Sequence, residues 1–203
     1  MEAVVNAIAV AAASGAAIIS FCLLREIRQS NKRQLRAYIG VGSLKLDLPG
    51  LENPNYEPIQ PNKPGLVVND CVLCTFKNYG GTPALDVKTH VSWQPIPFSQ
   101  MLPDDFSYPD RESITTPGIG RVVSHLHLMQ GQDHTARVPI YNVGVFRQAQ
   151  QREVTVYIYG HVDYRDVFGQ DWSRRFSYIY EPWQIVEQRF IPDQSHNDET
   201  KCN

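Results

Sequence analysis

A stretch of about 22 uncharged residues near the N-terminus constrains this chain most. Residues 3–24 read AVVNAIAVAAASGAAIISFCLL and contain no Asp, Glu, Lys or Arg. As a helix rising ~1.5 Å per residue, the stretch spans roughly 33 Å, which matches the apolar thickness of a bilayer. Its apolar residues surround the helix instead of lining one face. The stretch therefore predicts a transmembrane anchor over residues 1–24.

Two alternatives apply to the same stretch. A buried helix is one, because the alanine content and polar residues such as Asn6 and Ser14 weaken its hydrophobicity. A cleaved secretory signal is the other, since alanine-rich segments offer many cleavage sites. Signal peptides carry cations before the apolar region, whereas Glu2 precedes it here and the cations follow. The flanks therefore favour an anchor that stays in the chain.

The residues after the anchor are strongly basic and predict its orientation. Residues 25–36 read as a helical stalk, in which a single acidic residue, Glu26, stands against five cations. Positive flanks stay on the cytoplasmic side, so we expect a single-pass inner-membrane protein with the rest of the chain in the cytoplasm. Each cation near the surface also adds ~1 kcal/mol of attraction to anionic lipids. The cations assigned to the membrane are Arg25, Arg28, Lys32, Arg33 and Arg36.

Small residues recur every fourth position within the anchor, at Ala3, Ala7, Ala11 and Gly15. Such a stripe lets membrane helices approach closely, so self-association is one hypothesis. The alternative is that any alanine-rich helix produces the same spacing by chance.

Composition limits the classes of partner. The net charge of −2 over 203 residues lacks the excess of Lys and Arg that neutralises phosphates, and we therefore exclude nucleic acid as a partner. The four cysteines form no disulfide framework. Cys71 and Cys74 have a CxxC spacing, but on a strand they point to opposite faces, so buried thiols explain them better than a metal or redox pair.

Beyond Ala37 the hydrophobic period changes from helical to alternating, which indicates half-buried strands. The clearest alternation runs over residues 153–164, followed by a turn at 165–171 and a last strand at 172–180. A bulge near Gly42 and Ser43 keeps the apolar residues of the first strand on one face. Residues 49–64 and 94–120 predict loops, residues 136–150 are ambiguous, and the polar tail 192–203 predicts disorder. The fold class is mainly β: an N-terminal transmembrane helix followed by an immunoglobulin-like antiparallel β-sandwich over residues 37–191.

Three segments carry a resemblance to a known group: RAYIGV at 36–41, KNYGGTPA at 77–84 and YGHVDYRDVFG at 159–169. In order and spacing they resemble a group of uncharacterised bacterial single-pass membrane proteins over residues 36–180. The resemblance implies an anchor and a β domain, and no known activity. Members of that group usually carry Thr near the middle of the last strand, where this chain has Arg174 and Arg175.

Histidine and aspartate residues of the β domain could serve metal binding or ordinary structural roles. His125 and His127 share a strand face and could present two imidazoles to one metal, completed by His134, His161 or Asp163, although a solvated strand face also tolerates histidine. Asp166 and its acidic neighbours at 163 and 171 lack the spacing of a calcium loop, and a turn explains them better. No catalytic, cofactor or nucleotide motif is present, so no catalytic residue or cofactor is assigned.

The aromatic residues of the last hairpin suggest an interaction surface. Tyr157 and Tyr159 fall opposite the Val/Ile face of their strand, and Phe168 lies in the turn. The alternative is that both faces of this strand are covered, one by the other sheet and one by the long loop. The sequence favours a membrane-tethered binding or scaffolding module with a protein partner. A membrane-tethered enzyme or an accessory subunit of a membrane complex are the alternatives.

Overall fold

The computed structural model describes residues 2–52, 70–103, 106, 122–183, 190–193, 195 and 197–202, and excludes the side chains of 2–17 and 122–125. The chain divides into two compact units, residues 1–36 and 37–203. The first unit is a single helix, α1 (Glu2–Leu35). Among the described residues, no helix combines the length and apolarity that crossing a bilayer requires. The stripe of Ala3, Ala7, Ala11 and Gly15 lies outside the described side chains.

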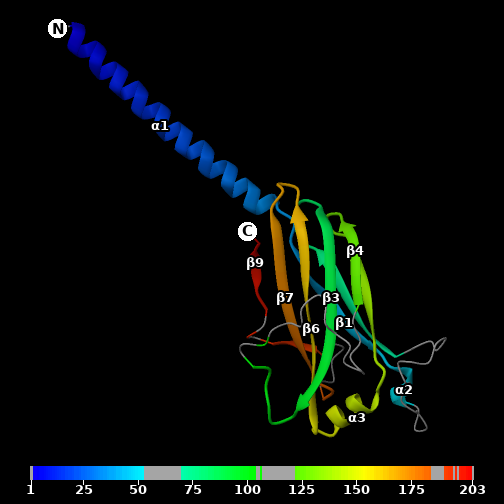
Figure 1. Ribbon diagram of the computed structural model, residues 1–203. Coiled ribbons are helices and arrows are strands. Elements are labelled where there is room, and N and C mark those ends of the chain that lie inside the picture. Colours follow the sequence, from blue (N-terminus) through cyan, green and yellow to red (C-terminus); the bar gives the residue numbers. More distant parts are fainter. Residues whose placement is uncertain are drawn as a thin grey trace. The chain divides into compact units, whose positions relative to one another are not determined.

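The second unit consists of two antiparallel sheets packed face to face (Figure 1). One sheet has three strands in the order β1-β2-β5: β1 (Ile39–Asp47), β2 (Cys71–Asn78) and β5 (Asp133–Pro139). The other has the order β4-β3-β6-β7-β8: β4 (Val122–Leu128), β3 (Ala84–Pro97), β6 (Val154–Asp166), β7 (Asp171–Tyr180) and β8 (Phe190–Pro192). A last strand, β9 (Glu199–Lys201), pairs with β7. The expectation of a mainly β, antiparallel domain is confirmed.

The main core lies between the sheets and is built by alternation. Val156, Ile158 and Val162 of β6 are almost completely buried, as their parity predicts. From the opposite sheet, Phe76 meets Phe176 edge to face, with ring centroids 5.5 Å apart. The short helices α2 (Pro49–Glu52) and α3 (Gly144–Gln150) contact each other at one end of the sandwich (Figure 1).

Two backbone irregularities let the strands keep their apolar residues inward. The β1–β2 register shifts between Val41 and Ser43, which confirms the expected bulge. Between β2 and β3, the sequence suggests a turn with positive φ at glycine. In the structure, hydrogen bonds from the side chain of Asn78 hold this connection instead. The amide of Asn78, fully buried, donates to the carbonyls of Thr82 (2.8 Å) and Leu128 (3.0 Å) and accepts from the Gly80 amide (2.9 Å). The Asn78 side chain thus satisfies three backbone hydrogen-bonding groups near the connection between the sheets.

Three regions differ from the sequence expectation. Strand β3 continues to Pro97, through residues expected to form a loop, because residues 94–97 pair with 154–157 of β6. The ambiguous region 136–150 divides into the end of β5 and helix α3. The tail, expected to be disordered, contributes β9, which pairs with residues 172–174 of β7.

The tail also ties the two ends of the domain together. The hydroxyl of Tyr164 lies 2.8 Å from Oε1 of Glu199 and 3.3 Å from the carbonyl oxygen of Ala37. Further along β7, the side-chain amide of Asn197 accepts a hydrogen bond from the backbone N–H of Ser177 and donates one to its carbonyl oxygen. The open side of β7 is therefore occupied by the chain's own C-terminal segment.

The outer face of the six-stranded sheet is also covered in part. A second cluster joins Ile96 and Leu102 to Tyr157 and Tyr159, and Phe106 packs edge to face on Tyr159 with centroids 5.0 Å apart. The segment after β3 thus folds back over β6. This is the covered-face alternative considered from the sequence.

Candidate functional site

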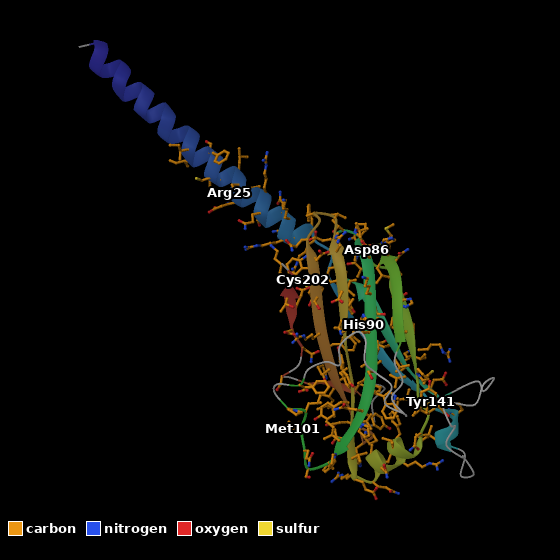
Figure 2. All side chains as sticks on the ribbon, viewed as in Figure 1. Arg25, Asp86, His90, Met101, Tyr141 and Cys202 are labelled. Atoms are coloured by element: carbon orange, nitrogen blue, oxygen red, sulfur yellow. The ribbon has the colours of Figure 1, made fainter. Side chains whose placement is uncertain are left out.

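Polar side chains occupy the remainder of this outer face, next to the aromatic cluster. Residues opposite one another in the sheet register place His90 beside His161 and, one step further, Lys88 beside Asp163. Figure 2 shows His90 further along β3 than Asp86, which lies near the strand's first residues. The face therefore changes from aromatic to imidazole to charged along the strands.

The charged end of this face forms a cavity of about 620 Å³. Strands β3, β4, β6 and β7 supply its walls, and the tail adds Cys202. A cavity of this size falls within the range of small-ligand sites. Its ionisable wall residues include Asp86, Lys88, Asp163, Arg165 and Asp171.

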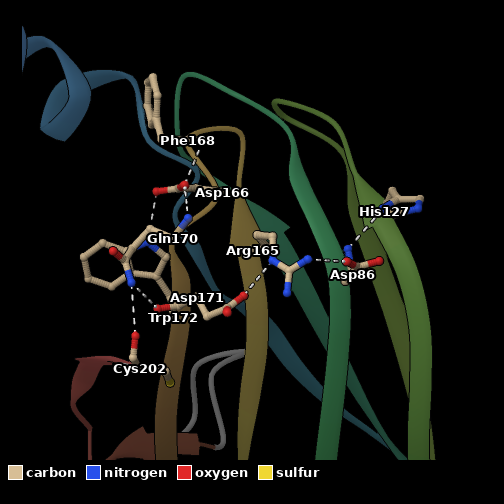
Figure 3. Close-up of polar contacts among 9 residues, drawn as sticks. All are labelled: Asp86, His127, Arg165, Asp166, Phe168, Gln170, Asp171, Trp172 and Cys202. Carbon is tan, nitrogen blue, oxygen red and sulfur yellow. Dashed lines mark hydrogen bonds and ion pairs between the residues drawn. The ribbon is translucent and has the colours of Figure 1, made fainter.

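Arg165 contacts two carboxylates of the cavity (Figure 3). Its Nε donates to Oδ1 of Asp171 at 2.8 Å, and its Nη1 lies 3.6 Å from Oδ2 of Asp86. The hydrogen bond and charge of Asp171 raise the pKa of Arg165 further above its ordinary value. A guanidinium fixed between two carboxylates presents a fixed pattern of charge to a ligand.

Asp86 lies at a β-bulge of β3. It adopts φ +49°, and the β3 register shifts on both sides, toward β4 and toward β6. Its amide donates to Nδ1 of His127 at 3.1 Å (Figure 3). Bulges of this kind commonly re-aim side chains at functional sites. Because simple alternation continues through residue 86 in the sequence, the bulge has no sequence signal.

The turn beside the cavity is built by Asp166, which is 3% exposed. Its Oδ1 accepts from the amides of Phe168 and Gln170, both at 2.9 Å, and its Oδ2 accepts from Nε1 of Trp172 at 3.0 Å (Figure 3). Gly169 supplies the positive φ of +77°. Both carboxylate oxygens are used within the protein, which supports the turn interpretation of Asp166 over a calcium loop.

The structure distributes the predicted metal ligands differently from the sequence hypothesis. The side chain of His125 lies outside the described residues. His127 is exposed, and its Nδ1 accepts a hydrogen bond from the backbone amide of Asp86. Among the described residues, a different group comes together: His90, His161 and Asp163 have ligand atoms within 4.8 Å of one another. His161 and Asp163 were considered as completing ligands. His90 is not among the ligands expected from the sequence, because its partner is set by sheet register.

The predicted interaction residues lie in two different environments. Tyr157 and Tyr159 are each 2% exposed, and burial raises the pKa of both hydroxyls. They belong to the covered aromatic cluster and form no exposed surface. Phe168 is 42% exposed at the tip of the β6–β7 turn.

The remaining candidate residues are the cysteines of the β domain and the cations of the basic stalk. Cys71 and Cys74 are buried with free thiols, and burial raises the pKa of both. On α1, the positions of Arg25, Arg28 and Lys32 follow the spacing of one helix face. All three border a hollow on the helix surface together with Phe21 and Leu24.

Comparison with known proteins gives no relative for this chain: no protein-family model, curated protein or solved structure matches it significantly.

Proposed function

We propose that this chain is a membrane-anchored binding module, with a single N-terminal span in a bacterial inner membrane and an immunoglobulin-like sandwich in the cytoplasm. The sandwich uses the charged cavity to bind a polar segment of a partner protein. The observation that carries the binding role is the set of charges of both signs that converge on one cavity.

The anchor part of the proposal rests on the sequence. About 22 residues without charge precede a flank with five cations, and this order favours retention of the flank in the cytoplasm. The face of α1 that carries Arg25, Arg28 and Lys32 suits anionic headgroups because of its positive charge. Phe21 and Leu24 adjoin it and suit the apolar side of the membrane interface.

The binding part rests on the cavity geometry. Arg165 is already paired with Asp171 and Asp86, so its direction is set before a ligand arrives. Lys88 and Asp163 supply a second cation and anion on the same wall. A peptide segment with both acidic and basic side chains is complementary to this pattern.

Reporter fusions test the anchor. One reporter active only in the cytoplasm and one active only outside are placed after Asn203 behind a flexible linker. We expect cytoplasmic activity and membrane-fraction protein that resists carbonate extraction. Activity outside, or extraction by carbonate, would overturn this part of the proposal.

Site-specific photocrosslinking in cells tests the cavity. A photoreactive residue at Leu126, in the cavity wall, should capture a partner, and the same residue at exposed Lys45 of β1 should not. The crosslink from position 126 should be lost when Arg165→Ala removes the central charge. A crosslink that persists in Arg165→Ala would contradict binding through the cavity charges.

A membrane-tethered enzyme is the second candidate. The observation that favours it is Asp163, which lines the cavity and also belongs to the His–His–carboxylate cluster. Two imidazoles and a carboxylate beside a cavity are the protein ligands of several metal-dependent hydrolases and oxygenases.

A further inference from the structure

We infer that the outer face of the six-stranded sheet binds one divalent transition-metal ion, with His90, His161 and Asp163 as its protein ligands. Each residue offers one ligand atom, and these atoms all lie within 4.8 Å of one another. The inference goes beyond partner binding, because it assigns an inorganic ligand to this face and shares only Asp163 with the charged cavity.

The sheet holds the three ligands in fixed relation. His90 of β3 and His161 of β6 are direct register partners, and their rings stack with centroids 4.2 Å apart and planes 15° from parallel. Asp163 lies two residues after His161 on the same strand face, with its Oδ2 3.8 Å from Nε2 of His161. Ligands on neighbouring strands of a sheet are held more rigidly than ligands on loops.

Gly160 enables this close approach from the opposite face. A Cβ at this position would lie 1.9 Å from the carbonyl oxygen of His90 and 2.7 Å from the ring of Phe176. Only glycine leaves room for the His90 backbone and the core phenylalanine together. The backbone that presents His90 to His161 therefore depends on a residue outside the ligand set.

Burial makes these groups good ligands. His90 is 8% exposed, and the side chains of His161 and Asp163 are 12% and 16% exposed. A partly desolvated carboxylate and two imidazoles favour a cation, because little hydration has to be removed from the ligands when the ion binds.

The required adjustment is small. Tetrahedral zinc with bonds of about 2.0–2.2 Å sets neighbouring ligand atoms roughly 3.3–3.5 Å apart. The observed separations exceed this by less than ~1.5 Å, which side-chain rotation covers. The ion would replace the present contact between His161 and Asp163.

The donor set selects the type of metal. Imidazole favours zinc, iron, cobalt and nickel over the hard ions calcium and magnesium, which prefer oxygen ligands. Three protein ligands leave at least one coordination position for water or a ligand group. Asp163 also lines the charged cavity, so the proposed site adjoins that cavity.

Two neighbouring cations lower the expected affinity of the site for a metal ion. Lys88 faces Asp163 and Arg175 faces His161 in the sheet register. Their charge weakens attraction for a dication, so the affinity is below that of closed structural zinc sites. The Lys88→Met variant, which keeps the length of the side chain and removes its charge, should therefore bind metal several-fold more tightly.

Calorimetric titration of the full chain in detergent, after treatment with a chelator, tests the site with zinc as the metal. We expect one ion per chain, and at least about tenfold weaker binding in His90→Gln, His161→Gln and Asp163→Asn. The matched control His127→Gln should bind as the wild type does, because this exposed histidine lies outside the ligand set. Circular dichroism verifies that each variant is folded.

Cobalt substitution identifies the ligands in the wild-type chain and does not depend on the variants folding. Nitrogen and oxygen ligation gives visible d–d bands without the near-ultraviolet sulfur charge-transfer band that cysteine ligation produces. The same spectrum in Cys202→Ser excludes the cavity thiol as a ligand. No stoichiometric zinc binding, unchanged affinity in the His90 and His161 variants, or a thiolate spectrum would each overturn the inference and leave a metal-free His161–Asp163 contact.

Discussion

Individual buried residues set much of this structure. Asn78 joins the crossing between the sheets, Asp166 builds the β6–β7 turn, and Gly160 makes room for the backbone of His90. In each case one residue satisfies or accommodates groups from other parts of the chain. Substitutions at these positions therefore act on stability before they act on any ligand.

Replacing Gly160 with alanine tests the close approach of β3 and β6. The added Cβ would overlap the His90 carbonyl, so we expect the free energy of unfolding to fall by roughly 1–3 kcal/mol, as for other overpacked cores. Urea denaturation measures the change. As a matched control, Gly131→Asn lies in open space at φ +75°, a conformation that asparagine tolerates, and should cost clearly less. Equal losses in the two variants would contradict the overlap.

Replacing Asp166 with alanine removes the acceptor of three hydrogen bonds in the turn. We expect a loss of roughly 2–4 kcal/mol in the free energy of unfolding, because the donors of Phe168, Gln170 and Trp172 lose a charged partner. The exposed Asp171→Ala variant should lose much less stability. Chemical denaturation of both variants, followed by tryptophan fluorescence, distinguishes them. A similar loss in both would show that the turn does not depend on Asp166.

The thiol of Cys74 makes stability depend on alkaline pH. Burial raises its pKa above the ordinary value of 9.0, so the folded chain keeps this proton to higher pH than the unfolded chain. The resulting stabilisation is complete below pH 9.0 and is lost as the pH rises above that value. Denaturation midpoints between pH 8 and about 10.5 should therefore decline, and decline less steeply in Cys74→Ala. An unchanged slope in Cys74→Ala would contradict this, and Cys202→Ala, with an exposed thiol, is the control.

At the scale of elements, the strands were predictable where alternation was strong. The inward set on β6 and the bulge at Gly42 and Ser43 follow from apolar parity alone. From the sequence, the covering of Tyr157 and Tyr159 is only one of two alternatives, because the covering residues Leu102 and Phe106 belong to a segment more than 50 positions earlier. Local sequence carries no record of which distant segment returns to a face.

The candidate site was predictable only in part for the same reason. The turn role of Asp166 follows from an Asp and a Gly between two alternating strands. The approach of His90 to His161 depends on the pairing of β3 with β6, across 71 positions of the chain. Strand β9 has only three residues, too few to give a periodic signal, and forms because β7 offers it unpaired backbone groups.

Removal of residues 194–203 tests the role of the tail. Without Asn197 and β9, the backbone groups of β7 at residues 172–177 lose their partners, so another chain can pair with them. We expect lower stability and concentration-dependent association, measured by light scattering. A matched truncation after Lys201 keeps β9 and should remain like the full chain. A monomeric, equally stable chain lacking 194–203 would contradict a protective role.

At the scale of the whole molecule, the expected orientation depends on the charge of the stalk. Replacing Arg25, Arg28, Lys32, Arg33 and Arg36 with glutamine removes the asymmetry across the proposed anchor. We expect reporters after Asn203 to show a mixture of cytoplasmic and external molecules in place of one orientation. The control replaces five cations of the β domain, which lie far along the sequence from the anchor, and should leave orientation unchanged. Unaltered orientation in the stalk variant would contradict control by charge.

The hydroxyl of Tyr164, which holds Ala37 and Glu199 together, also bears on how the domain responds to mechanical load. A pull transmitted through the stalk enters the domain at Ala37, next to the point where the tail is fastened. Only three register pairs join β9 to β7, whereas nine join β6 to β7. We therefore expect tension at the N-terminus to separate β9 from β7 first, while the pairings between the longer strands stay intact.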